Sequence, residues 1–370
     1  AAAEACAHDL EELGLTVERH PVPAETVRAH GMVSATNLIV RRRFGSGPII
    51  ALNAHGDVVP PGDGWTQDPY GGALVGGWLY GRGAAVSKSD IAAYAFALLA
   101  LEAVGEVAHG TVELHVTWDE EAGGAIGPGW LLEQGLSHPD LVVCAGFPYS
   151  VVTAHNGCLH LEVEVVGRSA HAAKPATGID ALEAATHVLQ ALYAERPKLA
   201  ARTSAVAGIG SPQLTVGLIR GGINTNVVPD RVRLRLDRRL IPEENGGEVE
   251  AGLTRLIEGA VAAVPGAKVT VRRLLLAEPL QETPASRRLG EALAEEASAV
   301  LGEPVGLAGV PLYTDARHYA EAGIPTVLFG AGPRTIEEAN AHRADERVPV
   351  RELHLATVAI ARALQKLLAT

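Results

Sequence analysis

The sequence has little of what marks a specialised protein class. Aromatic residues make up 4% of its 370 residues and there is a single methionine, so alanine, valine and leucine must fill the core. Its three cysteines, Cys6, Cys144 and Cys158, are an odd number without paired spacing, which favours a reducing, cytoplasmic compartment. The formal charge of -12 disfavours nucleic acid as a partner, because a phosphate backbone needs a basic face on the protein.

Long hydrophobic runs are also absent. The most apolar helical stretch, residues 91–101, is shorter than the ~20 residues that a membrane-spanning helix needs, so no membrane partner is expected. No signal peptide is visible. The chain opens without methionine on AAAEACAHDLEELGL, a pattern typical of an amphipathic helix already under way, and we expect residues upstream of Ala1 to be missing. The length fits two domains of ordinary globular composition.

The pattern along the chain predicts a larger α/β domain with a smaller domain inserted into it. Residues 1–157 alternate apolar strands with helices, which favours a mostly parallel sheet flanked by helices. Residues 158–273 contain strands that alternate polar and apolar residues around two helices, as in LHLEVEVVG and VRLRLDRRL, which is typical of a small α+β unit. The first pattern resumes at residues 274–370.

Several polar residues directly follow predicted strands of the larger domain. His55 and Asp57 follow one strand, and Asp119, Glu120 and Glu121 follow another. The carboxyl ends of parallel strands meet at one edge of a sheet, where binding and catalytic sites of such folds lie. The sequence therefore predicts a catalytic cleft at this edge.

Four segments, NAHGDVVPPGDGW, LYGRGAAVSKSD, TWDEEAGG and AHRADE, occur in order around the inserted domain. Together they resemble the metallopeptidase family of aminoacylase, carboxypeptidase G, acetylornithine deacetylase and succinyl-diaminopimelate desuccinylase. The resemblance extends from about residue 10 to the end. It implies amide hydrolysis by water activated between two zinc-like ions, with a glutamate moving the proton.

The resemblance assigns roles to single residues of this chain. Glu120 matches the general acid/base, and Asp57 matches the carboxylate that orients the imidazole of His55. The residues that match metal ligands are His55, Glu121 and His342.

Two other ligand positions depart from the family pattern. In the segment GRGAAVSK, Val86 stands where the family has the aspartate that bridges both ions. After LVVCAG, Phe147 precedes Pro148 where the family has an acidic residue. Neither side chain offers a lone pair to a metal, so a normal dinuclear centre is not expected.

Three interpretations of this altered centre stay open. In the first, His55, Glu121 and His342 hold one zinc-like ion and the enzyme hydrolyses an amide. In the second, no ion binds, and Glu120 with the pair of His55 and Asp57 carries out an elimination, isomerisation, decarboxylation or cyclisation. In the third, the protein binds its ligand without catalysis.

The resemblance also implies a substrate side and a homodimer formed through the inserted domain. His171, in SAHAAKP, matches a histidine that reaches the substrate carbonyl from the partner subunit, and Asn226 matches an asparagine that faces the same site. Arg239 matches a position near a substrate carboxylate, and the backbone of Gly330 and Gly332 in FGAG offers further donors. We therefore expect a small substrate with a free carboxylate, such as an N-acyl amino acid or a dipeptide-like compound.

Other histidines lie within predicted strands, namely His109, His115, His155 and His160. A lone histidine in a strand is more often a surface or packed residue than a metal ligand, and we interpret these four in that way.

Overall fold

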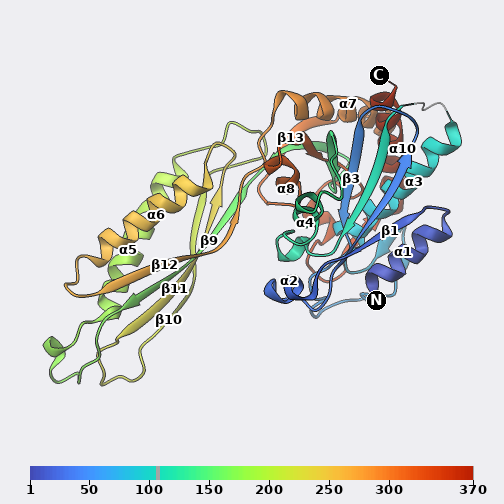
Figure 1. The fold of residues 1–370 in the computed structure, drawn as a ribbon. Helices are drawn as coiled ribbons and strands as arrows, with labels where there is room; N and C mark the ends of the chain where they lie inside the picture. The colour runs from blue at the N-terminus through green and yellow to red at the C-terminus, as the bar shows by residue number, and fades with distance from the viewer. Residues whose placement is uncertain (106–108, 370) are drawn as a thin grey trace. The chain divides into compact units, whose positions relative to one another are not determined.

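A computed structural model of the chain describes residues 1–105 and 109–369, which divide into two compact units (Figure 1). Unit 1 comprises Ala1–Thr153, Glu282–Ala308 and Thr314–Thr370, and unit 2 comprises Ala154–Gln281 and Gly309–Tyr313. The boundaries predicted at 157/158 and 273/274 lie inside unit 2, because β12 (Lys268–Ala277) stays paired with β9 (Gly157–Val166) along its whole length.

Unit 1 contains an eight-stranded sheet in the order β1-β2-β6-β3-β7-β14-β8-β13. Its four central strands, β6, β3, β7 and β14, run parallel, while β1, β2 and β8 pair antiparallel at the edges. A mostly parallel sheet flanked by helices is thereby confirmed. The strands are β1 (Val17–Pro21), β2 (Thr36–Arg43), β3 (Ile49–His55), β6 (Thr111–Thr117), β7 (Leu141–Cys144), β8 (Ser150–His155), β13 (Gly306–Val310) and β14 (Thr326–Leu328).

The central strands are buried on both sides because helices cover both faces of the sheet. Val112, Leu114 and Val116 of β6 point into the main core with α3, α7 and α10, whereas His115 points to the other face and contacts Tyr319 of α8. The helices of unit 1 are α1 (Ala2–Glu12), α2 (Ala24–Ala29), α3 (Ser89–Val104), α4 (Pro128–Glu133), α7 (Pro284–Leu301), α8 (Ala316–Glu321), α9 (Ile336–Ala339) and α10 (Val350–Leu368).

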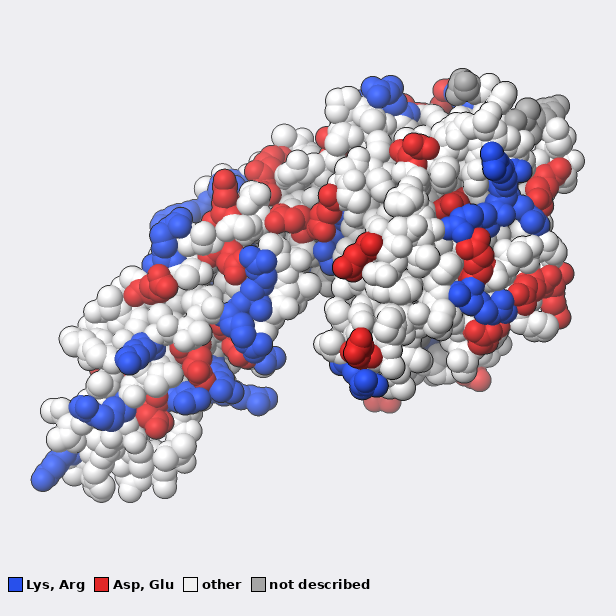
Figure 2. Space-filling model, viewed as in Figure 1, with Lys and Arg blue, Asp and Glu red and all other residues white. Residues whose placement is uncertain are grey.

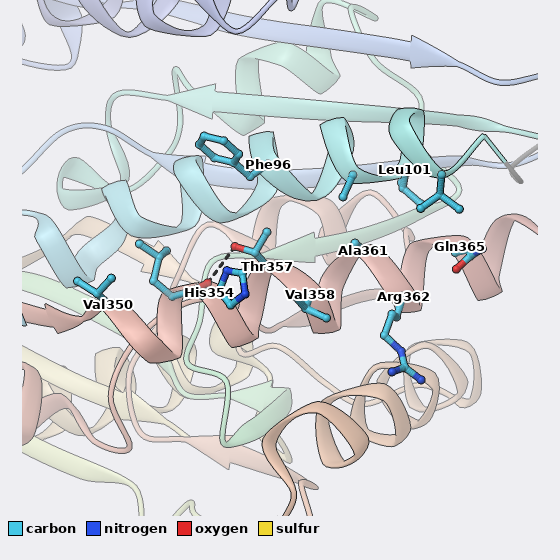
Figure 3. A pocket seen from close by; sticks show the side chains of 12 residues that line it. Phe96, Leu101, Val350, His354, Thr357, Val358, Ala361, Arg362 and Gln365 are labelled. Atoms are coloured by element: carbon cyan, nitrogen blue, oxygen red, sulfur yellow. Dashed lines mark hydrogen bonds between the residues drawn. The ribbon is translucent and has the colours of Figure 1, made fainter. Parts of the chain in front are cut away.

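Helix α3 is the central helix of this core. Together with the turn before it, residues 84–104 form the one helical run of the described chain that is long and apolar enough to cross a membrane by length and composition, and 67% of its apolar window is buried inside the protein. Its remaining face borders an apolar surface cavity of about 570 Å³ between α3 and α10, lined by Phe96, Leu101 and Val350 among others (Figure 3). This cavity contains none of the residues predicted to be catalytic.

A small three-stranded sheet pairs segments that lie far apart in the sequence of unit 1. Strand β5 (Trp78–Tyr80) pairs with both β4 (Ala73–Val75) and β15 (Arg347–Pro349). This pairing places the segment that precedes Arg347 beside the turn that follows Tyr80. Both segments contain predicted site residues, so the small sheet is the link that positions them.

Unit 2 is an antiparallel sheet with helices on one face. Its strand order is β10-β11-β9-β12, and leucines and valines of β9 and β11 pack against the two helices. The opposite face carries acidic and basic side chains that pair across neighbouring strands. Lys and Arg are interspersed with Asp and Glu over the visible surface of unit 2 in Figure 2. The elements not yet bounded are α5 (Ala181–Ala200), β10 (Gln213–Gly221), β11 (Arg231–Leu240) and α6 (Gly246–Val261).

Candidate active site

The polar residues predicted at strand ends lie at one edge of the unit 1 sheet. His55 is the last residue of β3, and the short helical turn Glu120–Ala122 follows β6. Because β3 and β6 are parallel neighbours with His55 opposite Thr117, both strands deliver their next residues to the same place. The structure thereby brings His55, Asp57, Glu120 and Glu121 together.

The carboxylate of Asp57 organises this group. His55 Nδ1 lies 3.2 Å from Asp57 Oδ1 and 3.1 Å from the Asp57 carbonyl, so this nitrogen carries the proton and donates it. The backbone amides of Glu120 and Glu121 donate to the two oxygens of the same carboxylate, at 3.3 and 3.1 Å. His55 Nε2 is then directed towards Glu120, with 3.9 Å between it and Oε2.

Burial and neighbouring charges set the protonation states of Glu120 and His55. Burial raises the pKa of Glu120, and the carboxylates of Glu121 and Asp57 raise it further, against the opposing charges of His55 and His342. Burial alone would lower the pKa of His55, but its hydrogen bond to Asp57 and the charge of Glu120 hold it above its ordinary value. With a pKa of about 10 for His55 and about 7 for Glu120, the imidazole stays protonated at neutral pH, while the carboxyl can take up or release a proton there.

His342 comes from the far end of the sequence and completes the group on the Glu121 side. Its Nε2 donates to Glu121 Oε1 at 2.9 Å, and its side chain is half exposed. His342 has a φ of 61°, a left-handed conformation that is uncommon for a residue with a Cβ. The turn that contains His342 thus holds the imidazole against Glu121.

Two residues that the sequence did not single out build the loop between β5 and α3. Glu346 is buried and accepts hydrogen bonds from the amides of Gly83, Ala85 and Val86, at 3.0 to 3.1 Å, and from Arg82 at 2.6 Å. The Ser87 hydroxyl accepts from the His55 amide at 3.0 Å and donates to the His55 carbonyl at 3.2 Å. For Glu346, the available signal in the sequence was that the segments GRG and ADE both belong to the motifs that carry the family resemblance.

Val86 and Phe147, the two residues predicted to stand in place of acidic metal ligands, pack in one small apolar cluster. The cluster also contains Ala85, Ala339 and Val348. Gly332 lies directly beneath the Phe147 ring, where a Cβ would overlap ring carbons. Hydrocarbon side chains therefore surround both Val86 and Phe147.

The FGAG loop uses its amides for a side chain of this chain. Ala331 donates its N–H to Asp90 Oδ1 at 2.7 Å, and Gly330 lacks a Cβ where that carboxylate lies. Burial raises the pKa of Asp90 well above its ordinary value. Asp90 is thus turned towards Gly330, one turn of helix beyond Val86.

The predicted substrate-side residues of the inserted segment lie in unit 2. His171 and Asn226 are exposed on adjacent segments, joined by a bridge between His171 and Val227 and by the Ala172 amide donating to the Asn226 carbonyl at 3.0 Å. Arg239 lies near the other end of β11, about 27 Å of strand from Arg231, and its Nε donates to Asp237 at 3.0 Å. Within unit 2, His171 and Asn226 therefore lie on neighbouring segments, whereas Arg239 lies at the other end of β11.

Metal-donor atoms converge in one place within residues 1–105 and 109–369. There, one group of three His, Cys, Asp or Glu side chains has its donor atoms within 4.8 Å of one another, and it is Cys158, His160 and Asp237 of unit 2. His55, Glu121 and His342 do not meet this distance together.

Comparison with known proteins places the chain among peptidases and deacylases. The model of peptidase family M20/M25/M40 matches residues 51–366. Succinyl-diaminopimelate desuccinylase of Rhizorhabdus wittichii is 32% identical over 361 residues, covering 93% of this chain and 87% of the relative. Acetylornithine deacetylase of Salmonella arizonae is 31% identical over 350 residues, covering 92% and 84%. The solved structure of aminopeptidase PepT from Bacillus cereus superposes with a TM-score of 0.76 at 22% identity, covering 100% of this chain and 92% of that one.

Proposed function

Because the chain belongs to peptidase family M20/M25/M40, we propose that it hydrolyses the amide bond of a small N-acyl amino acid or dipeptide-like substrate that bears a free carboxylate. The observation that carries this proposal is the group at the β3 and β6 ends, where Asp57 orients His55 and Glu120 lies 3.9 Å from the outer imidazole nitrogen. The relatives named as a desuccinylase and a deacetylase support the N-acyl substrate class.

Glu120 is the proposed general acid/base. Its carboxylate takes a proton from the attacking water and returns it to the leaving amine. Burial favours the protonated carboxyl, which makes Glu120 a competent donor near neutral pH in the second half of this cycle. When no ion is bound, His55, held by Asp57, orients and stabilises Glu120 through its charge.

The proposal includes at most one zinc-like ion at this site. The donor set does not fit a metal pair, because Val86 and Phe147 contribute hydrocarbon where two acidic ligands are required. Glu121 and His342, with 2.9 Å between their nearest atoms, fit two neighbouring ligands of one ion, and His55 would be the third. Such an ion supplies Lewis acidity towards water and the scissile carbonyl.

On the substrate side, His171 and Asn226 are proposed to serve the site of a partner subunit in a cytoplasmic homodimer formed through unit 2. His171 would donate to the oxyanion, and Arg239 would bind the substrate carboxylate. Gly330 and Gly332 are proposed to offer backbone amides to the substrate carboxylate. These roles rest on the family resemblance of the segments that contain them.

A metal-independent reaction is the second candidate, and the apolar cluster favours it. Val86 and Phe147 make the surroundings of the loop drier than two carboxylates would, and the pair of His55 and Glu120 is by itself able to move a proton. Elimination, isomerisation, decarboxylation or cyclisation of the same carboxylate substrates would need nothing more.

The first experiment tests Glu120 on a panel of N-succinyl and N-acetyl amino acids and dipeptides. We expect Glu120→Gln to lower kcat by about 10²–10⁴-fold, because it removes the proton acceptor and keeps the shape. Glu133→Gln, at an exposed position on α4, is the matched control and should leave kcat unchanged. Equal activity of Glu120→Gln and wild type would overturn the assignment, and ligand binding without turnover in wild type would indicate a binding protein.

The second experiment separates the two candidate reactions. Elemental analysis and product identification are done on wild type and on Glu121→Gln with His342→Ala, before and after a strong chelator. Hydrolysis that is lost on chelation and in this variant supports the one-ion hydrolase. Turnover that is unaffected by both, with a rearranged product, supports the metal-independent enzyme.

The third experiment tests the carboxylate. We expect Arg239→Ala to raise KM about 10- to 100-fold for a carboxylate substrate and much less for its amide, because a charge-assisted pair is lost only in the first. An equal change for both substrates would contradict the role of Arg239.

A further inference from the structure

Three side chains with soft and borderline metal-donor atoms meet on the open face of the unit 2 sheet. Cys158 and His160 are two residues apart on β9, so both point to the same face, opposite to Leu159 and Leu161 of the helix-covered core. Asp237 on β11 lies directly opposite His160 in the antiparallel register. Cross-strand neighbours on one face have Cβ atoms about 4.5–5.5 Å apart, which is near enough for their side chains to share a ligand.

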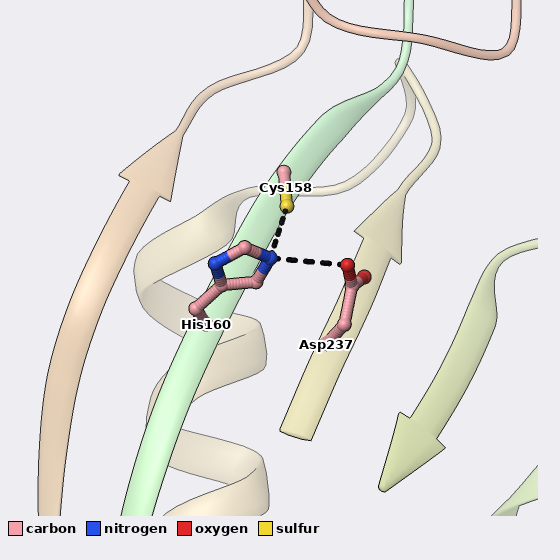
Figure 4. A group of neighbouring side chains, drawn as sticks. All are labelled: Cys158, His160 and Asp237. Atoms are coloured by element: carbon pink, nitrogen blue, oxygen red, sulfur yellow. Dashed lines mark hydrogen bonds and ion pairs between the residues drawn. The ribbon is translucent and has the colours of Figure 1, made fainter. Parts of the chain in front are cut away.

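One nitrogen of His160 is the meeting point. Nε2 lies 3.2 Å from Cys158 Sγ and 3.0 Å from Asp237 Oδ2, and Figure 4 shows the thiol and the carboxylate converging on it. A proton relay of cysteine, histidine and aspartate would use the two different ring nitrogens. Here both partners face the same nitrogen, so the three atoms surround a point and do not form a relay.

From this geometry we propose that Cys158, His160 and Asp237 bind a single zinc-class divalent cation. Zinc takes cysteine sulfur at about 2.3 Å and histidine nitrogen or carboxylate oxygen at about 2.1 Å, which in a tetrahedron separates neighbouring donors by about 3.4–3.6 Å. The distances of 3.2 and 3.0 Å need to widen by only a few tenths of an ångström. Thiolate and imidazole donors select zinc-class ions over magnesium or calcium.

The surroundings fit a site with one open position. Cys158 is fully buried, whereas the side chains of His160 and Asp237 are 38% and 31% exposed, so solvent reaches the group from one side only. Arg239 donates Nε to the other carboxylate oxygen of Asp237, Oδ1, at 3.0 Å, which fixes the carboxylate and directs Oδ2 to the group. A thiolate and a carboxylate offset the two charges of the ion. The fourth position is left to water or an exogenous ligand.

This site is independent of the residues proposed for hydrolysis in unit 1, and the experiment keeps the two apart. The unit 1 background is defined as the full-length chain with His55→Ala, Glu121→Gln and His342→Ala. After loading with zinc and gel filtration, we expect this background to retain one zinc per chain by elemental analysis. Adding Cys158→Ser or His160→Ala should weaken zinc binding by more than about 100-fold, because each removes one of three donors.

Cobalt identifies the sulfur ligand directly. In the unit 1 background, cobalt should give a near-ultraviolet thiolate-to-metal charge-transfer band together with visible bands of four-coordinate geometry. Cys158→Ser should abolish the charge-transfer band, and Cys6→Ser, which removes a half-buried thiol on α1, should keep it. Cys158→His should keep zinc binding and lose the charge-transfer band, because it exchanges sulfur for nitrogen.

Asp237→Asn is a milder variant that tests the proposal if Cys158→Ser or His160→Ala disturbs the folding of the sheet. It preserves the shape and the hydrogen bond to His160, and it should weaken zinc binding while leaving the far-ultraviolet circular dichroism unchanged. Hydrogen exchange of β9 and β11 should slow on zinc addition in wild type and not in Cys158→Ser. A unit 1 background that retains no zinc, or zinc binding that survives Cys158→Ser and His160→Ala undiminished, would overturn the proposal.

Discussion

The two larger sheets of this protein place charged side chains in opposite environments. The central strands of the unit 1 sheet bury their ionisable groups, such as Glu113 and His115 on β6, which are 3% and 0% exposed and hydrogen-bonded to each other at 2.9 Å. The unit 2 sheet displays charge to solvent, where Glu164 accepts hydrogen bonds from Arg231 and Arg233 at 3.1 and 2.7 Å. The same pairing of acid with base thus occurs in two environments.

This difference shows where charged side chains affect the stability of the fold. A buried group must keep its partners, because losing one leaves a desolvated charge uncompensated. An exposed pair is screened by water and salt and contributes little to stability.

All four tryptophans, Trp65, Trp78, Trp118 and Trp130, belong to unit 1, so their fluorescence reports unfolding of that unit alone.

The largest effect is expected at Glu113. Burial alone would raise its pKa, but the hydrogen bond and charge of His115, with hydrogen bonds from Ser137 and Arg41, lower it from 4.5 to about 2. Because the folded-state value is depressed, the stabilisation is present above pH 4.5 and is lost as the pH falls towards about 2. Its size is on the order of 3 kcal/mol. Glu113→Gln should remove it, as measured by urea unfolding followed by tryptophan fluorescence.

The pH dependence provides the control for Glu113. The difference in unfolding free energy between wild type and Glu113→Gln should be constant above about pH 5 and shrink at lower pH. A difference that stays constant down to pH 2 would show that packing, and not the charge of Glu113, is the cause.

A smaller effect is expected from Gly332→Ala. The new Cβ would overlap the Phe147 ring, which should destabilise unit 1 by about 1–3 kcal/mol. In a Phe147→Ala background the same substitution should cost less than about 0.5 kcal/mol, because the obstructing ring is gone. Gly306→Ala, where a Cβ meets nothing within 4 Å, is the matched control. Equal costs in both backgrounds would exclude the proposed contact.

Val86→Asp adds a carboxylate at a partly buried position of the apolar cluster and tests the comparison further. Without metal we expect a loss of about 1–2 kcal/mol, since the carboxylate lies among Ala85, Phe147 and Val348. With zinc we expect the loss to be recovered and the number of ions bound per chain to rise. Val33→Asp, at a residue 98% exposed, should change neither quantity. Destabilisation without any gain in metal binding would show that more than this one ligand is missing.

The smallest effect is expected from Glu164→Gln on the open face of unit 2. Its unfolding midpoint, followed by far-ultraviolet circular dichroism, should shift by less than about 2 °C. The shift should disappear in about 0.5 M salt, because the ion pairs are screened. A shift as large as that of Glu113→Gln would break the comparison between the sheets.

The sequence predicted those features that depend on local patterns. Apolar runs that end in polar residues located His55, Asp57 and Glu120 at strand ends, and the ordered motifs predicted the family and the fold class, both of which are confirmed. The role of Glu346 was not predicted, because its hydrogen bonds join segments about 260 residues apart.

The group of Cys158, His160 and Asp237 shows a second limit. A histidine within an alternating strand is indistinguishable from any other surface residue until the pairing register of β9 and β11 is known. A one-residue shift in that register would move Asp237 to the other face. Only tertiary structure fixes the register, so the three donors could not be assembled from their spacing.

Strand β14 lies between β7 and β8, although about 170 residues follow β8 before it is made. During synthesis at roughly 5–20 residues per second, β7 and β8 are on the ribosome for roughly 10–35 s without the strand that joins them. Residues 154–281 of unit 2 emerge in full during this time. The nested topology therefore allows unit 2 to fold first, and the unit 1 sheet can close only after the last 45 residues of the chain begin to be made.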